Sequence, residues 1–211
     1  MSLARVRRDY TAPALLESRT PAEPLALFRR WLAVALKSVN LEPNAMTLAT
    51  LGARGRPRAR MVLLKDADAR GFTFYTNLSS AKARELARHA DAALVLWWPE
   101  SSRQVRIEGH IVPVSASESD AYFAQRPRDA QLGAWASPQS RVLPSRAALT
   151  ERLARVTARF VSGNVPRPPH WGGYRLVPRA MEFWQGQPSR LHDRLRYTRR
   201  AGGWRRERLA P

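Results

Sequence analysis

Arg190, His192 and Arg194 alternate with Leu191 and Asp193 in one short stretch near the C-terminus. If this stretch is a β-strand, successive side chains point to opposite faces, so two guanidinium groups flank an imidazole along one face. Arginine offers planar, charged donors to phosphate or carboxylate, and histidine readily exchanges a proton near neutral pH. Such a row suits an anionic, aromatic substrate. The alternative is a solvated edge strand in an arginine-rich chain, and the stretch alone slightly favours that alternative.

A second candidate is the segment 75–82, which is predicted to end a strand and begin a helix. Asn77, Ser79 or Ser80 is suited to cap that helix. Free N–H groups and the helix dipole favour an anion there, and a bound phosphate would offset the unfavourable position of Lys82 in the first turn. The alternative is a solvated lysine that costs a few tenths of a kcal/mol.

Two further segments carry paired polar groups. Arg60 and Lys65 bracket an apolar strand, and strict alternation puts them on opposite faces, so both reach one ligand only at a strand end or a bulge. Tyr122 and Arg126 are four residues apart and would share a helix face. An ordinary core strand and a basic helix end are the respective alternatives.

Two weaker candidates complete the set. Gln139 and Ser140 lie in a proline-flanked loop that could hydrogen-bond a ligand. Trp184 could stack on one, although a buried core tryptophan is the commoner fate.

The four histidines, at 89, 110, 170 and 192, show no metal-binding spacing, and no phosphate-binding glycine loop is present. No metal is therefore expected.

Composition excludes several classes. The 211 residues contain no cysteine, which removes disulfides, thiolate metal sites and cysteine nucleophiles. The net charge of +19 allows nucleic acid, an anionic membrane or phosphorylated small molecules as partners. Only Lys37, Lys65 and Lys82 among the 36 basic residues are not arginine, and no nucleic-acid motif or membrane-spanning run occurs. We expect a cytoplasmic protein with no nucleic-acid or membrane partner.

The elements that must position these residues are mostly strands. Residues 1–23 read as an extended arm, and 24–39 as an amphipathic helix beginning at Pro24. Short apolar runs predict strands at 45–51, 59–65, 72–76, 92–98, 104–114, 174–177, 181–184, 191–197 and 204–209. Helices are expected near 79–88, 117–125 and 145–161, and a loop at 162–173. Short connections favour antiparallel pairing, so we predict one antiparallel barrel with helices, a single domain spanning 24–211.

Taken together, the segments are more specific than any one of them. They occur in order at 60–65, 74–77, 103–105, 122–129, 133–135, 171–173, 182–186, 190–194 and 208–211. This series resembles the pyridoxine/pyridoxamine 5′-phosphate oxidase family from residue 7 to the last residue. The resemblance implies a mainly β protein with helices, an FMN-binding split β-barrel, working as a homodimer with FMN at the subunit interface. It also implies oxidation of pyridoxamine or pyridoxine 5′-phosphate to pyridoxal 5′-phosphate, with O2 as acceptor and H2O2 released.

The resemblance also implies roles by position. FMN contacts fall on Arg60, Met61, Val62, Leu63, Leu64, Lys65, Tyr75, Thr76, Lys82, Gln104, Gln139, Ser140, Trp184 and Arg194. Substrate contacts fall on Lys65, Tyr122, Arg126, Arg190, Leu191 and His192, with Arg190 and His192 at the reacting end. The resemblance further implies that the N-terminal arm, with Arg7 and Tyr10, can close over the site as a lid.

Two positions depart from the family pattern. Ala81 stands where an arginine usually precedes the phosphate-binding lysine, and Ala130 where a serine usually touches the substrate phosphate. Each change removes a contact of a type worth roughly 1.5–3 kcal/mol. Three competing hypotheses remain for the function: another split-barrel flavoprotein such as a flavin reductase, a basic nucleic-acid-binding module, and a non-catalytic carrier of B6 phosphates.

Overall fold

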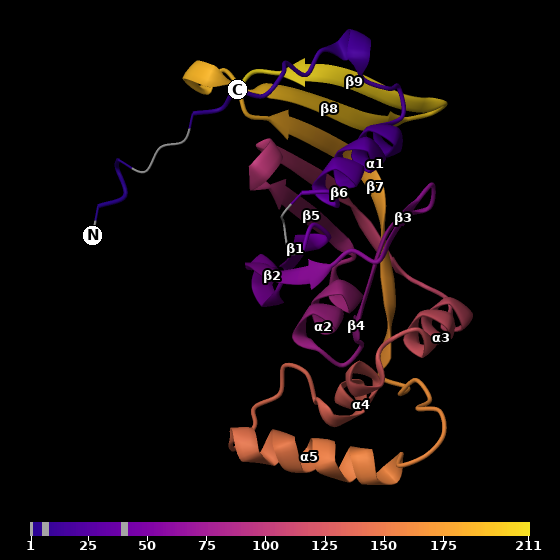
Figure 1. Ribbon diagram of the computed structural model, residues 1–211. Helices are drawn as coiled ribbons and strands as arrows, with labels where there is room; N and C mark the ends of the chain where they lie inside the picture. The colour runs from indigo at the N-terminus through magenta and orange to yellow at the C-terminus, as the bar shows by residue number, and fades with distance from the viewer. Residues whose placement is uncertain (1, 6–8, 39–41) are drawn as a thin grey trace.

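The computed structural model describes residues 2–5, 9–38 and 42–211. Within them, nine strands form one antiparallel sheet in the order β2-β1-β5-β6-β7-β4-β3, and β8 pairs with β7 and β9 (Figure 1). The strands are β1 (Ala45–Leu51), β2 (Pro57–Leu63), β3 (Asp66–Asp68), β4 (Gly71–Asn77), β5 (Asp91–Trp98), β6 (Arg103–Pro113), β7 (Trp171–Gln185), β8 (Asp193–Arg200) and β9 (Gly203–Leu209).

The long strand β7 connects the two ends of the molecule. Its first part pairs with β4, its last part pairs with β8, and β6 runs beside nearly all of it. The sequence predicts two short strands here, at 174–177 and 181–184. Pro178 lies between them and cannot donate a ladder hydrogen bond. Pro178 is accommodated at a register shift opposite Gly109, so the strand continues through it.

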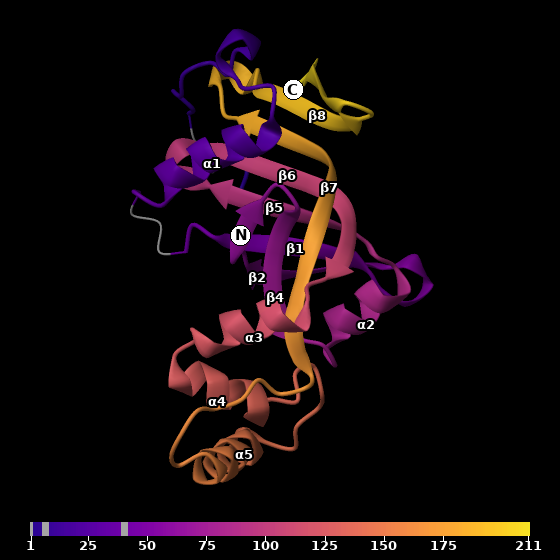
Figure 2. The ribbon, with the colours of Figure 1, turned by 90° about the vertical axis from the view of Figure 1, so that its right-hand side faces the viewer.

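The helices are α1 (Pro24–Ala35), α2 (Ala81–Arg88), α3 (Ala116–Ala124), α4 (Arg128–Ala136) and α5 (Arg146–Arg159). Helices α3, α4 and α5 lie at one end of this sheet, and the hairpin of β8 and β9 lies at the other, with α1 nearer the hairpin (Figures 1 and 2). Helices α3, α4 and α5 follow one another at the end where β4 and β7 meet, far from β8 and β9 in both views. The sequence reading missed α4, which is short and begins directly after Pro127.

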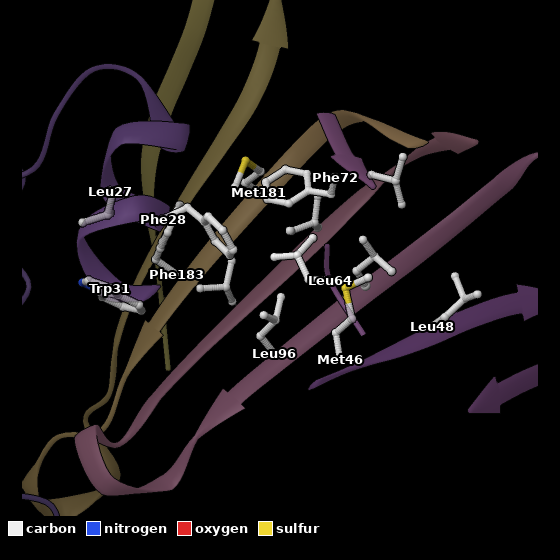
Figure 3. Packing of buried hydrophobic residues seen from close by; sticks show 14 of the residues in the cluster. Leu27, Phe28, Trp31, Met46, Leu48, Leu64, Phe72, Leu96, Met181 and Phe183 are labelled. Atoms are coloured by element: carbon white, nitrogen blue, oxygen red, sulfur yellow. The ribbon is translucent and has the colours of Figure 1, made fainter. Parts of the chain in front are cut away.

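The core lies between α1 and the sheet (Figure 3). Phe28 meets Phe72 edge to face at 4.9 Å between ring centroids, and Trp31 meets Phe183 at 5.2 Å. Both helix residues are almost fully buried. The predicted strand at 45–51 is confirmed, and it has one buried face, since Met46 and Leu48 are fully buried while their neighbours are partly exposed.

Residues 9–23 are fixed to the C-terminal hairpin. Arg208 donates to both carboxylate oxygens of Glu17, at 2.7 and 2.8 Å, and to the carbonyl of Leu15 at 2.7 Å. This pairing holds the pKa of Glu17 at about 2. The Tyr197 hydroxyl donates to the carbonyl of Pro21 at 2.9 Å. The arm therefore has defined contacts from its middle onward.

Several predicted boundaries change. The first helix ends at Ala35, short of the expected residue 39, which lies outside the described residues. The expected loop 162–173 ends earlier, because β7 already begins at Trp171. The expected strand 191–197 begins only at Asp193. No helix in the described parts of the chain is long and apolar enough to cross a membrane.

Candidate active site

A cavity of about 680 Å³ lies at the end of the sheet that carries the helices. Its walls come from β2, β4, the first turn of α2, the α3–α4 connection and the start of β7. Ten residues predicted to bind cofactor or substrate line it: Met61, Val62, Leu63, Lys65, Tyr75, Thr76, Lys82, Tyr122, Arg126 and Gln139. The volume falls within the usual range for small-molecule and cofactor sites.

Lys82 enters this cavity from the first turn of α2. The Ser80 hydroxyl caps the helix by accepting from the Ala83 N–H at 3.4 Å, so one of the three proposed caps is confirmed. The ammonium group donates to Gln139 Oε1 at 2.7 Å and to Thr76 Oγ1 at 3.1 Å, both neutral partners. Burial, together with the charge of Arg60, lowers the pKa of Lys82. An anion bound here would reverse that effect.

Arg126 also lines the cavity. The sequence predicts that it shares a helix face with Tyr122, but α3 ends at Ala124, so Arg126 lies beyond the helix. Its guanidinium carbon is 4.9 Å from the ring centroid of Trp171, and its buried Nη1 has no hydrogen-bond partner among the described residues. Burial lowers the pKa of Arg126, and the Tyr122 hydroxyl opposes that shift. An unpaired buried guanidinium nitrogen calls for an acceptor.

The aromatic wall of the cavity is a set of parallel rings. Tyr75 stacks on Tyr122 at 4.1 Å and 13°, and on Trp171 at 5.3 Å and 5°. Gly173 makes this possible, because a Cβ there would lie 2.7 Å from a Tyr75 ring carbon. Burial, followed by the charge of Glu118, raises the pKa of Tyr75. The tyrosine stays a neutral hydrogen-bonding surface at ordinary pH.

Three predicted contacts on this side do not line the cavity. Arg60 donates to Glu85 at 2.6 Å and to the carbonyl of Leu48 at 3.3 Å, so its charge already has a carboxylate partner. Leu64 is buried in the core. Ser140 is exposed, in the left-handed backbone region at φ +68°. Their assignments to FMN stay predictions.

The remaining candidates gather at the end of the sheet where β6, β7 and β8 lie side by side. Trp184 on β7 is the register partner of Gln104 on β6 and of Arg194 on β8. Arg194 donates to Glu182 Oε1 at 2.8 Å and to the carbonyl of Ala210 at 2.9 Å. The pairing with Glu182 raises the pKa of Arg194. None of these residues lines the cavity.

His192 belongs to this second group. Its ring lies 4.6 Å from that of Trp184 and 5.4 Å from that of Tyr10, and Tyr10 also packs on Trp184 at 5.7 Å. His192 Nδ1 accepts from the Gln187 N–H at 3.1 Å, so the neutral ring carries its proton on Nε2. Burial, together with the charge of Arg190, lowers the pKa of His192.

The predicted strand row through this stretch is wrong for Arg190 and His192. Pro188–Arg190 form a 3-10 turn, in which Ser189 and Arg190 have φ values of +56° and +62°. β8 begins only at Asp193. Arg190 and His192 therefore lie on a turn, and Leu191 is 69% exposed on it. Of the predicted lid, Tyr10 contacts the His192 ring, while Arg7 lies outside the described residues.

Residues 33–160 match the family model described as pyridoxamine 5′-phosphate oxidase. Residues 171–211 match the pyridoxine 5′-phosphate oxidase C-terminal dimerisation region. The chain belongs to the pyridoxamine 5′-phosphate oxidase family. The family resemblance inferred from the motifs is thereby confirmed.

Individual relatives agree with this assignment. A pyridoxine/pyridoxamine 5′-phosphate oxidase from Microcystis aeruginosa is 55% identical, covering 100% of this chain and 99% of the relative. The crystal structure of PhzG from Burkholderia lata 383, in complex with tetrahydrophenazine-1-carboxylic acid, is 38% identical with a TM-score of 0.88, covering 95% and 99%. An FMN-binding protein from Nostoc punctiforme related to pyridoxamine 5′-phosphate oxidase is 18% identical, with a TM-score of 0.70 over 94% and 100%, and shares the fold. The predicted fold, mainly β with helices and of the FMN-binding split-barrel class, is confirmed.

Sequence reasoning missed some residues of this oxidase-family cavity. Trp171, Gln125, Asn77 and Ser137 line it, and none was assigned a binding role. Trp171 stands in one of the family motifs, which was the available signal. Ala130, one of the two departures from the family pattern, also lines the cavity.

Proposed function

We propose that this chain oxidises pyridoxamine 5′-phosphate and pyridoxine 5′-phosphate to pyridoxal 5′-phosphate, with FMN as cofactor. The substrate loses two electrons and two protons, O2 accepts them as H2O2, and the amine substrate also releases ammonia after water adds. The observation that carries the proposal is the charge of the cavity. Lys65, Lys82 and Arg126 line it, and no aspartate or glutamate of the described residues does.

The cavity suits FMN on its Lys82 side. Lys82 lies at a helix start and donates to the oxygens of Thr76 and Gln139, and a phosphate would replace these neutral acceptors of the ammonium group. Met61, Val62 and Leu63 supply an apolar wall from β2 for a flat ring. When bound, FMN supplies the two-electron chemistry, and the protein supplies position and charge.

The substrate phosphate belongs on the Arg126 side in this proposal. Arg126, Lys65 and Tyr122 all line the cavity and would supply two cations and a phenol, and the Arg126 Nη1 has no hydrogen-bond acceptor among the described residues. A phosphate oxygen is a suitable acceptor for that nitrogen. A substrate without a phosphate or another anion would leave it buried and unpaired.

His192, Arg190 and Leu191 would contact the substrate ring, and Gln104, Trp184 and Arg194 the flavin. Because none of these residues lines the cavity, we propose that a homodimer brings the two groups of residues together, with FMN at the subunit interface. The match of residues 171–211 to a dimerisation region supports this arrangement. There His192 would present its Nε2–H donor, held in place by the Gln187 N–H on Nδ1.

A visible spectrum tests the activity. The purified protein is expected to show bound FMN that bleaches when pyridoxamine 5′-phosphate is added without oxygen and recovers when air is admitted. A flavin that bleaches only with NADH would instead support a flavin reductase. Tight binding of the B6 phosphate without bleaching would support a carrier, and salt-sensitive binding of nucleic acid without flavin would support the basic module.

Mixed dimers test the two-ended site. Arg126→Ala breaks the cavity and His192→Ala breaks the opposite end, so each pure variant should be nearly inactive. In a mixed dimer one site combines both intact ends, so refolding equal amounts together should restore about a quarter of the wild-type rate. No recovery on mixing would mean that both ends come from the same chain.

A cytoplasmic location also stays a proposal, which fits the cysteine-free sequence and is tested by cell fractionation.

A further inference from the structure

Trp171 lies where the aromatic wall of the cavity meets its unpaired arginine. The Arg126 guanidinium carbon is 4.9 Å from the Trp171 centroid and 5.6 Å from that of Phe123. Phe123 in turn meets the Trp171 ring edge to face at 5.0 Å. The cation is thus held by aromatic faces, and no carboxylate is paired with it among the described residues.

This mode of holding leaves the arginine free to bind. A carboxylate partner takes the N–H edge of a guanidinium through a two-pronged hydrogen bond, which is the same edge that a phosphate needs. An aromatic ring contacts the flat face instead and leaves the N–H groups available. The buried, unpaired Nη1 of Arg126 agrees with that description.

We propose that Trp171 is a positioning residue that holds Arg126 in place for the substrate phosphate. The inference rests on the proposed function, because it concerns the phosphate end of the same substrate. Trp171 acts through Arg126, and its contribution should be specific to phosphate recognition. It should leave the flavin and the chemical step largely unaffected.

The position of Trp171 is itself well determined. It is the first residue of β7, and its N–H donates to the Pro168 carbonyl at 3.0 Å. Only 6% of the residue is exposed to solvent. Arg167 donates to the Trp171 carbonyl at 2.6 Å and also to Asp120 on α3 at 2.6 Å. One arginine thereby ties the tryptophan to the helix that carries Tyr122, so the ring and the phenol keep a fixed relation.

The chain offers a matched control in Trp135. Arg159 lies over the Trp135 ring at 5.1 Å, and the Trp135 indole N–H donates to the Pro166 carbonyl at 2.8 Å. This pair has the same chemistry in the same part of the fold, but Trp135 does not line the cavity. Trp135→Leu therefore measures the general cost of removing an indole that supports an arginine.

The experiment compares Trp171→Leu, Trp171→Phe and Trp135→Leu in the FMN-loaded enzyme. Trp171→Leu should raise KM for pyridoxamine 5′-phosphate about tenfold. This is the change expected from losing the free energy of a partly desolvated cation–π contact. The inhibition constant of inorganic phosphate should rise in parallel, while kcat changes by about twofold or less. Trp171→Phe should recover much of the loss, and Trp135→Leu should leave both constants near wild type.

Three results would overturn the proposal: unchanged KM in Trp171→Leu, a fall in kcat at constant KM, or equal effects in Trp135→Leu. If Trp171→Leu does not fold, Trp171→Phe and Arg126→Lys are combined in a double-mutant cycle on KM. Coupled effects support the positioning role, and additive effects overturn it. A wild-type enzyme that takes up no FMN or fails to oxidise pyridoxamine 5′-phosphate would instead refute the proposed function, so the two failures are distinguishable.

Discussion

Two regions of the molecule each pack a tyrosine ring against a glycine. One is the cavity, and the other is the end of the sheet around Trp184. Tyr75 lies on Gly173 in the cavity, and Tyr10 lies on Gly186 at the sheet end, where a Cβ would come within 2.6 Å of the ring. They differ in how their cations are paired. In the cavity the hydrogen-bond partners of Lys82 in the described part of the chain are neutral, whereas at the sheet end Arg194 is paired with a carboxylate.

In the proposed function, this difference separates cations that are available to a phosphate from cations that already have a carboxylate partner. The same contrast extends to Arg126, which has an unpaired nitrogen, and Arg208, which is paired with both Glu17 and Asp193. A paired arginine has little to offer an incoming anion, while an unpaired buried cation favours one strongly. The +19 net charge does not itself locate the ligand. From the pairing state of individual cations we infer that the phosphates bind in the cavity.

The largest effect that would test this division is on turnover. His192→Ala should lower kcat roughly 100- to 1,000-fold, as expected for losing a donor positioned at the reacting group, while FMN content stays near wild type. His89→Ala, at the exposed end of α2, is the control and should be nearly silent. Steady-state kinetics and the flavin-to-protein absorbance ratio measure both quantities. Loss of flavin in step with turnover would contradict the division.

The converse change affects the cofactor first. Lys82→Ala should weaken FMN binding roughly 10- to 100-fold, because it removes a charged donor to a phosphate. Turnover of the FMN-saturated enzyme should change much less. Arg84→Ala is the matched control, since Arg84 lies on the same helix but does not line the cavity. Fluorescence titration of FMN gives the two dissociation constants, and equal weakening in both variants would make the effect one of bulk charge.

The two ends also differ in how far the sequence predicted them. The cap at Ser80 and the strand at 45–51 followed from local rules, because helix capping and short apolar runs depend on neighbouring residues. The turn at Ser189 and Arg190 did not, since two non-glycine residues with positive φ are rare and interrupt an alternation that otherwise fits a strand.

Long-range contacts explain the remaining misses. The Gly172 and Gly173 pair favours a loop by composition, yet Gly173 lies in β7 because the Tyr75 ring packs against it. Pairing of cations was equally hidden, since Arg60 and Glu85 are 25 residues apart in sequence. Only the structure therefore shows which arginines are free to bind an anion.

A smaller effect should appear in the pH profile. The pKa of His192 is lowered by burial and by Arg190, so kcat/KM should fall toward acid with a midpoint below the ordinary value of 6.5. The fall occurs because a protonated Nδ1 can no longer accept from the Gln187 N–H. Arg190→Gln removes one of the two causes and should move the midpoint upward while leaving it below 6.5. A downward shift would mean that another group titrates.

The smallest predicted effect concerns Ala81, the first residue of α2, next to Lys82. Because Arg60 is paired with Glu85, Lys82 is the main free cation at this helix start among the described residues. Ala81→Arg should therefore tighten FMN binding about fivefold, or about 1 kcal/mol, with the gain shrinking at high salt. In a double-mutant cycle Lys82→Ala should cost less when Ala81→Arg is present, since two cations then share one phosphate. Strictly additive dissociation constants at two salt concentrations would place the FMN phosphate away from this helix start.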